Sequence, residues 1–384
     1  MPGRDQNSPA LNPAANEAAR AALFAQGFFS SITMPTQTWS DSGSYTFDFP
    51  HAGIGLYASV RLSGTLTWTD TNTSAVAPVL STRAPFNLFK SVVYKDYLGN
   101  TRISSSGPIL HAIETLKTFD DTAGEAANTT AKRGYSNTAI DKFAIGGTSG
   151  TGVAVDIALI VPFTLHENTT IGTLPFTVPS GNNTLYLTLN PLYSGLTAGT
   201  VDPNSPLQTA GTGHATTTTA NLTGATIEVT YYYIDPLPGM ELPLMDFSQV
   251  YEIVDVQTTD NLSQNATKQI LLPTGRTYQA LYGELVNAGA LTDTGVTNIK
   301  LLINESTPTL NETYNAYLHR IRRTYGRDLQ TGQFIWDWRA RPLSPSNYGS
   351  IALQLLLGSG FTASGTTWFN LGKESLYVLQ TQVY

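Results

Sequence analysis

The chain has 384 residues and a formal net charge of −7 at pH 7, and only 13% of its residues are charged. Sequence-independent binding of nucleic acid requires clustered cations, so an acidic chain without a basic run excludes direct nucleic-acid binding. The absence of cysteine excludes disulfides and thiolate chemistry. A surface with few charges is desolvated at low electrostatic cost, which is typical of a subunit with large permanent interfaces, although a secreted β-protein fits this composition equally well.

The N-terminal segment predicts an arm followed by a helix. Residues 1–12 are predicted to be disordered, and Asn12 followed by Pro13 predicts a helix that runs to Gln26. This start lacks the pattern of a signal peptide, and the longest apolar run, residues 157–163, is too short to span a membrane. We therefore expect a soluble protein made in the cytoplasm.

Four apolar side chains cluster where this helix ends: Leu23, Phe24, Phe28 and Phe29. One interpretation is a helix that packs on its own subunit. The other is an arm that contacts a neighbouring subunit or a lipid surface, in which case these four residues are the candidate contact.

From Met34 onward the apolar residues recur with period two, which predicts β-strands. In the clearest run, alternate residues from Ala58 to Trp68 are mostly apolar and the residues between them are mostly Ser and Thr, as in a half-buried antiparallel strand. The two long polar segments 120–150 and 194–224 are predicted to be loops, and loops of that length are usually functional or interfacial. Further strands are predicted at 45–49, 153–161, 185–189 and 227–233.

A break at residues 235–239, Asp-Pro-Leu-Pro-Gly, suits a linker between two domains. One further helix is predicted, from about Glu312 to Tyr325. Its C-terminal end, where cations are favoured, carries Arg320, Arg322 and Arg323. These arginines either form a solvated helix face or make ion pairs with carboxylates of an adjacent subunit. Strands after the break are predicted at 253–256, 270–272, 278–286, 299–303, 334–338, 351–357 and 376–379.

Two consecutive sets of antiparallel strands predict an all-β protein of two packed sandwiches with few short helices, and jelly rolls are one way to limit exposed sheet edges. The predicted divisions are an N-terminal arm and helix at 1–33, a first jelly roll at 34–235 and a second jelly roll at 236–384.

Catalytic motifs are missing from the sequence: we find no nucleophile elbow, no phosphate-binding loop with its lysine and no zinc-binding helix. The acidic group Asp120, Asp121 and Glu125 is interpreted as a solvated loop. The tyrosines at 231–233, and Trp336 with Trp338, are predicted to pack in the core, with an interface or a glycan platform as the alternative. We therefore expect no enzyme activity, no cofactor and no metal site.

Several segments resemble the major capsid proteins of tectiviruses, which are tailless icosahedral phages with an internal membrane. The run from Pro85 to Tyr94, followed by a helix-like segment at 106–116, is similar to the first jelly roll of that family. The segment 227–246 is similar to the crossing between its two jelly rolls. Near the C-terminus, the arginine-rich helix and the aromatic strand 334–338 extend the resemblance.

This resemblance implies a double jelly roll of two eight-stranded units, with three subunits forming a pseudo-hexagonal capsomer. It places the N-terminal helix on the inner side of the shell, near an internal lipid membrane around double-stranded DNA. The implied partners are the other copies of a homotrimer, neighbouring capsomers, and minor capsid and penton proteins, in a virion assembled in the host cytoplasm. Two other classes stay open: a carbohydrate-binding or adhesin-like β-sandwich, and a polysaccharide-active enzyme.

Overall fold

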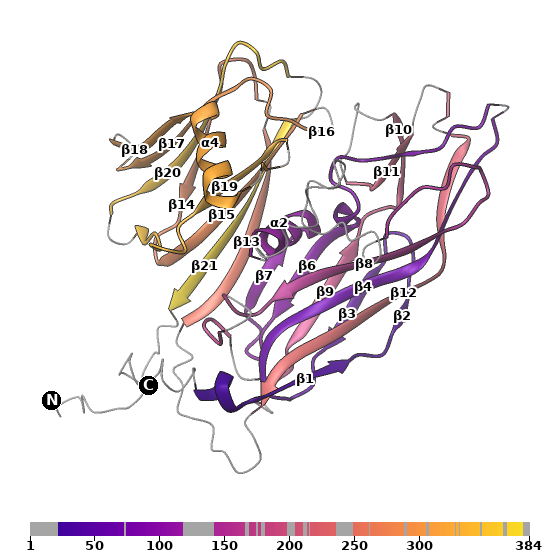
Figure 1. Ribbon diagram of the computed structural model, residues 1–384, viewed down its shortest axis with the longest axis horizontal. Coiled ribbons are helices and arrows are strands. Elements are labelled where there is room, and N and C mark those ends of the chain that lie inside the picture. The colour runs from indigo at the N-terminus through magenta and orange to yellow at the C-terminus, as the bar shows by residue number, and fades with distance from the viewer. Residues whose placement is uncertain are drawn as a thin grey trace.

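The protein folds into two β-sandwiches that share one long sheet (Figure 1). The computed structural model describes residues 22–378, apart from residues 73, 215, 261, 327 and 330 and the segments 118–141, 166–168, 174–175, 178–180, 198–203, 210–212, 236–248, 288–289, 305–306, 346–347 and 364–366. The predicted arm, most of the predicted first helix, the linker after Asp235 and the acidic group at 120–125 lie outside the described residues.

The first jelly roll consists of two four-stranded sheets. One sheet has the order β1-β12-β4-β8 and the other the order β3-β9-β6-β7. Its strands are β1 (Phe28–Thr33), β3 (Ser44–Asp48), β4 (Ile54–Asp70), β6 (Phe89–Lys95), β7 (Thr101–Ser105), β8 (Val153–Pro162), β9 (Thr184–Leu189) and β12 (Thr218–Asp235). Short additions are β2 (Gln37–Thr38), β5 (Val79–Leu80), β10 (Tyr193–Thr197), β11 (Leu207–Thr209), the 3-10 helix η2 (Phe86–Leu88) and the helix α2 (Gly107–Lys117).

The second jelly roll repeats this arrangement with the sheets β13-β21-β15-β19 and β14-β20-β17-β18. Its strands are β13 (Gln249–Asp260), β14 (Thr267–Leu272), β15 (Arg276–Asn287), β17 (Val296–Ile303), β18 (Thr307–Thr313), β19 (Gln333–Asp337), β20 (Ile351–Leu357) and β21 (Thr367–Val378), with the short β16 (Ala290–Leu291) and the helix α4 (Tyr314–Tyr325). The predicted fold class, two consecutive eight-stranded jelly rolls with few helices, is confirmed.

Alternation along the strands builds the core. In β4, the side chains of Ala58, Val60 and Leu62 point inward and are buried, while Arg61 between them is exposed. Antiparallel pairing sets Leu62 against Ile157 of β8, so that apolar residues of neighbouring strands meet on one face. The resulting hydrophobic cluster is continuous through both jelly rolls.

Three boundaries differ from the sequence-based expectations. Strand structure begins at Phe28 rather than Met34, because β1 pairs along β12. The predicted loop 194–224 is too long, since β12 begins at Thr218 and pairs with β4 from Asp70 onward. Residues 307–313 form β18, and α4 starts only at Tyr314, capped by the Thr313 side chain. Tertiary pairing decides these boundaries, and local composition does not reveal it.

No helix in the described part of the chain is long and apolar enough to cross a membrane.

Candidate functional site

The two jelly rolls meet along a seam, which we define as the contact of β7 and α2 of the first roll with β13, β21 and β15 of the second. At its centre β7 pairs with β13 in parallel, with Ile103 opposite Ile253, so one sheet runs through both rolls (Figure 1). The backbone N–H of Tyr251 also donates to the carbonyl of Gly172, at 2.7 Å. Gly172 has a φ of +89°, which L side chains rarely adopt, and it lies directly against the backbone of Tyr251.

Helix α2 fills the space between the rolls. Ile109, Leu110 and Ile113 are all fully buried, so the helix is covered on more than one side. Ile109 packs directly against Gly372 of β21, where any side chain on residue 372 would collide with it. A helix that is apolar around most of its surface is one that lies inside the protein. Helix α2 therefore joins the two rolls.

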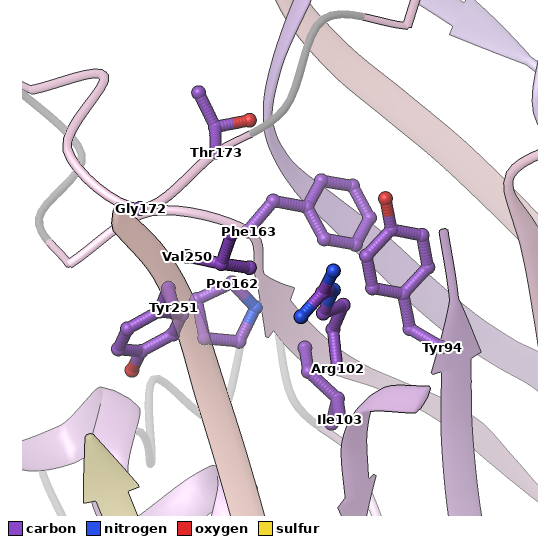
Figure 2. Close-up of a pocket in the computed structure, with 9 residues that line it drawn as sticks. All are labelled: Tyr94, Arg102, Ile103, Pro162, Phe163, Gly172, Thr173, Val250 and Tyr251. Atoms are coloured by element: carbon purple, nitrogen blue, oxygen red, sulfur yellow. The ribbon is translucent and has the colours of Figure 1, made fainter. Parts of the chain in front are cut away.

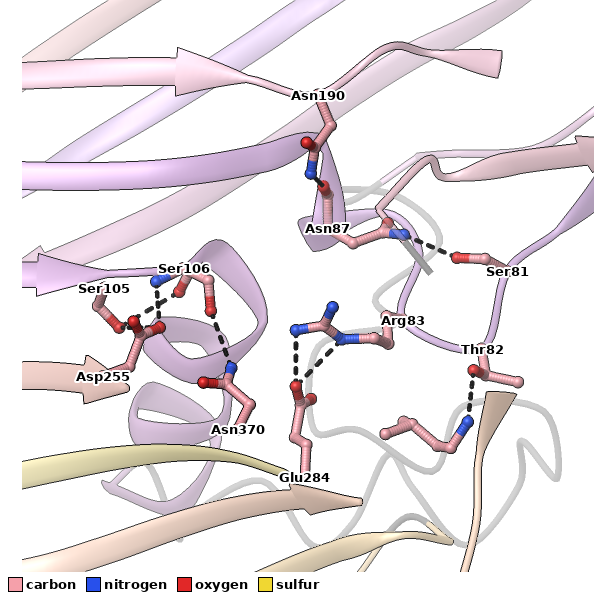
Figure 3. Close-up of polar contacts among 11 residues, drawn as sticks. Ser81, Thr82, Arg83, Asn87, Ser105, Ser106, Asn190, Asp255, Glu284 and Asn370 are labelled. Carbon is pink, nitrogen blue, oxygen red and sulfur yellow. Dashed lines mark hydrogen bonds and ion pairs between the residues drawn. The ribbon is translucent and has the colours of Figure 1, made fainter. Parts of the chain in front are cut away.

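A buried ion pair crosses the seam beside α2 (Figure 3). The Nε and Nη2 atoms of Arg83 donate to Oε2 of Glu284 at 3.0 and 2.7 Å, and the two side chains are only 4% and 1% exposed. The guanidinium also lies 5.6 Å from the ring centre of Trp368. Because each charge would be costly to bury alone, the pair favours one relative position of the rolls.

A second polar contact of the seam involves Asp255 of β13 (Figure 3). Its Oδ2 accepts hydrogen bonds from the backbone N–H of Ser106, at 2.6 Å, and from the Ser105 hydroxyl, at 3.3 Å. Burial raises the pKa of the Asp255 carboxyl above its ordinary value, and the hydrogen bonds from Ser106 and Ser105 only partly oppose this. The Asn370 amide donates to the Ser106 hydroxyl at 3.4 Å, so both β13 and β21 hold the start of α2.

Four charged residues of alternating sign line the lower part of the seam. Arg102 contacts Asp96 at 2.6 Å and Glu252 at 3.7 Å, and Glu252 also accepts from Arg276 at 2.8 Å. Arg102 lines a small pocket between the rolls with Tyr94, Ile103, Pro162, Phe163, Gly172, Thr173, Val250 and Tyr251 (Figure 2). These charges neutralise one another, so the pocket contains no uncompensated charge that would select a ligand.

The outward side of sheet β1-β12-β4-β8, which we call the first outer face, is mostly polar. Arg61 and Asp156 form a bidentate ion pair there, at 2.8 and 2.7 Å, and remain 48% and 34% exposed. This pairing lowers the pKa of the Asp156 carboxyl. Half-buried Glu228 lies opposite Arg61 on β12, and Tyr57 stacks on Tyr232 with ring centres 4.6 Å apart. Arg61 is exposed, and the other named side chains of this face are half-buried.

The four predicted contact residues of the N-terminal segment do not share one environment. Leu23 is fully buried against Ile54 and Ile234 of its own chain. Phe24 is half-buried, with its ring 5.7 Å from that of Phe29. Phe28 and Phe29 are 61% and 56% exposed. The helix therefore packs on its own subunit through Leu23, and Phe28 and Phe29 are the residues available for an external contact.

The three predicted arginines lie on α4, and two of them already have partners within the chain. Arg320 pairs with Glu312 at 3.0 Å and Arg322 with Asp328 at 2.8 Å. Arg323 is exposed and has no ion pair with any described residue. The opposite side of the helix packs inward through Tyr317, Ile321 and Tyr325.

Sequence reasoning missed the residues of the seam. Arg83 and Glu284 are 201 positions apart, and Ser106 and Asp255 are 149 apart, so no local pattern relates them. A charged residue inside an apolar strand, as Glu284 is in β15, is the one signal that points to a buried partner. The aromatic residues behave mainly as predicted, since Tyr231, Tyr233 and Trp336 are buried in the core.

Two adjacent eight-stranded jelly rolls joined by such a seam define the double jelly-roll class of protein. No family model matches the chain. The chain is 25% identical to the major capsid protein P3 of Enterobacteria phage PRD1, over 94% of each chain. The solved structure of the STIV MCP matches with a TM-score of 0.62 and 17% identity, covering 93% of this chain and all of that one. The major capsid protein P2 of bacteriophage PM2 matches with a TM-score of 0.50 and 10% identity, over 93% of this chain. The chain is thus a double jelly-roll protein and a homologue of a phage major capsid protein, and the predicted resemblance is confirmed.

We expect Arg83→Met to lower the free energy of unfolding by about 3–5 kcal/mol, because it leaves the Glu284 carboxylate buried without its cation. The double variant Arg83→Met with Glu284→Leu should lose clearly less unfolding free energy than the single variant, because no charge is left buried without a partner. Urea unfolding followed by tryptophan fluorescence measures both. Asp156→Asn is the matched control, since it breaks an exposed pair worth at most about 1 kcal/mol. Equal losses for the single seam variant and this control would show that the seam pair does not orient the rolls.

The raised pKa of Asp255 predicts a pH dependence with a definite sign. Between its ordinary pKa and its higher folded-state pKa, the folded protein binds more protons than the unfolded protein, so this group contributes stability that is lost as pH rises. The unfolding free energy of Asp255→Asn minus that of the parent chain should therefore increase from pH 3 to pH 7. A difference that falls over this range would mean that hydrogen bonds outweigh burial at this carboxyl.

Proposed function

We propose that this chain is a major capsid protein, a structural protein that forms the shell of a virion. The observation that carries the proposal is the seam, because it fixes two jelly rolls side by side as one building block. The sequence similarity to a phage major capsid protein over 94% of each chain supports the same function. The alternative of a carbohydrate-binding β-sandwich has little support, since Trp336 and Tyr231, proposed as parts of a glycan platform, are 1% and 0% exposed.

We infer that the building block acts as a homotrimer. Three copies of a two-roll subunit supply six similar rolls, which is the shape that a pseudo-hexagonal capsomer requires. The low charge content of the chain, 13% of its residues, supports this, because a surface with few charges is desolvated at lower electrostatic cost than a highly charged one. A permanent interface of this kind buries more than about 2,000 Å². Neighbouring capsomers, minor capsid proteins and penton proteins would be the further partners, with assembly in the host cytoplasm.

Light scattering coupled to size-exclusion chromatography should give three copies of 41.3 kDa, about 124 kDa, for the purified chain. The mass should persist on dilution, because a permanent trimer does not dissociate at working concentrations. A stable mass of one subunit would contradict the capsomer function and would direct attention to glycan binding instead.

We also propose that Phe28 and Phe29 contact a lipid membrane inside the shell. Phe28 and Phe29 are the first residues of β1, which begins at one end of the first jelly roll (Figure 1), and both side chains are more than half exposed. Exposed aromatic rings favour the boundary between lipid headgroups and acyl chains. Leu23 would not take part, since it holds the helix to its own subunit.

The double variant Phe28→Ser with Phe29→Ser should lose flotation with vesicles of phosphatidylethanolamine and phosphatidylglycerol while it keeps the trimer mass. Leu98→Ser with Leu271→Ser is the control, because these side chains are 59% and 54% exposed at other places on the surface. Equal flotation of the two double variants and the parent chain would contradict the proposed membrane contact. The proposed capsid function would be unaffected by that result.

A further inference from the structure

The last cross-strand pair between β1 and β12 places a carboxyl group beside an exposed aromatic ring. Phe28 of β1 lies directly opposite Asp235 of β12, and Phe29 lies opposite Ile234. Residues directly opposite each other in an antiparallel pair point to the same face of the sheet, with Cβ atoms about 5 Å apart. The side chains of Asp235 and Phe28 are therefore neighbours at the end of the roll for which a membrane contact is proposed above.

Asp235 ends a series of side chains that point into the first jelly roll. Tyr231 and Tyr233 precede it on the same face of β12, where both are buried and their ring centres lie 5.1 Å apart. Gly53, with a φ of +56°, lies so close that any side chain there would collide with Oδ1 of Asp235 and with the Tyr233 ring. Asp235 is therefore half-buried, and this burial raises the pKa of its carboxyl above the ordinary value.

The Asp235 carboxyl has no hydrogen bond or ion pair with any residue that the structure describes. Strand β1 and residues 22–27 before it contain no charged side chain. The titratable groups on the elements packed against Asp235 are Tyr231 and Tyr233 on β12, Tyr57 on β4, and His51 on the segment 49–53. Of these groups only His51 can become a cation, and its side chain is exposed.

We propose that Asp235 controls the membrane contact of Phe28 and Phe29: the rings enter the lipid boundary when this carboxyl is protonated, and the ionised carboxylate keeps them in water. The reason is desolvation. The Phe28 ring cannot move into the lipid boundary without bringing its neighbour Asp235 along, and an ionised group is far more costly to remove from water than a neutral one. This inference rests on the membrane contact proposed above and adds the residue that sets its pH dependence.

The sign of the pH dependence follows from linkage. Because the protonated carboxyl favours the membrane-bound form, binding takes up a proton, and binding weakens as pH rises through the pKa of Asp235. Phe29 lies on the opposite face of β1, with its ring 5.7 Å from that of Phe24, so the effect of Asp235 acts first on Phe28. A general effect of net charge would instead depend on every carboxylate at this end of the roll.

Flotation with vesicles of phosphatidylethanolamine and phosphatidylcholine tests the proposal, since these lipids keep zero net charge between pH 5 and pH 8. The fraction of the parent chain that floats should be several-fold larger at pH 5 than at pH 8. The variants Asp235→Asn and Asp235→Ser should float equally well at both pH values, at the level that the parent chain reaches at pH 5. Light scattering at each pH checks that the variants keep the trimer mass.

Asp48→Asn is the matched control. Asp48 is an exposed carboxylate at the end of β3, five residues before Gly53, and it accepts a hydrogen bond from the Thr184 hydroxyl at 2.7 Å. This variant removes the same charge from the other sheet of the roll, so it should keep the pH dependence of the parent chain. His51→Gln should keep it as well, because the proposal assigns the pH dependence to Asp235.

The outcomes separate this proposal from the ones on which it rests. If Asp235→Asn keeps the pH dependence of the parent chain, or if His51→Gln abolishes it, the control by Asp235 is overturned and the membrane contact stands. Weak flotation of both Asp235 variants at pH 5 would show a structural role and would also overturn it. A parent chain that floats at neither pH overturns the membrane contact together with its control, and the capsid function is unaffected.

Discussion

The buried contact between the two jelly rolls is the constraint on which the rest of this structure depends. Without this contact, the second roll would expose the sheet face that contains Tyr251, Tyr282 and Glu374, and the first roll would expose the apolar residues of α2. Pairing β7 with β13 makes the sheet continuous, and α2 then covers Gly372 and its neighbours. Because the Arg83–Glu284 pair is nearly inaccessible to water, a shift of one roll against the other would leave two charges buried and unpaired. The seam therefore favours one relative position of the two rolls.

The fixed orientation of the two rolls matters because a shell contains many copies of the subunit, and an error in the angle between the rolls would recur in every copy. A subunit whose two halves could rotate would present its outer surfaces in a range of directions, and a closed ring of three copies would then cost conformational entropy. The seam removes that freedom during folding. The low charge content has a related effect, since burying a charge costs more than burying a hydroxyl group that finds a hydrogen-bond partner.

The helices α2 and α4 occupy the same position in their two rolls but have very different sequences. Helix α2 follows β7 and helix α4 follows β18, yet α2 is buried on more than one side through Ile109, Leu110 and Ile113, whereas α4 has three arginines and only one buried side. The difference follows from what covers them, because α2 lies between two rolls of one chain, whereas α4 lies at the surface of the single chain.

By itself the sequence determined the strands and the fold class. Period-two alternation, as in β4, and the helical spacing of Tyr317 and Ile321 are local properties, and burial of one face follows directly from them. The low charge and the absence of cysteine likewise indicated a protein held together by packing and association. The tertiary structure alone decided the seam, the start of β1 and β12, and the different environments of Leu23 and Phe28. These depend on contacts between residues far apart in the chain, 201 positions for Arg83 and Glu284 and 264 for Ser106 and Asn370, and no local pattern carries information about a partner so distant.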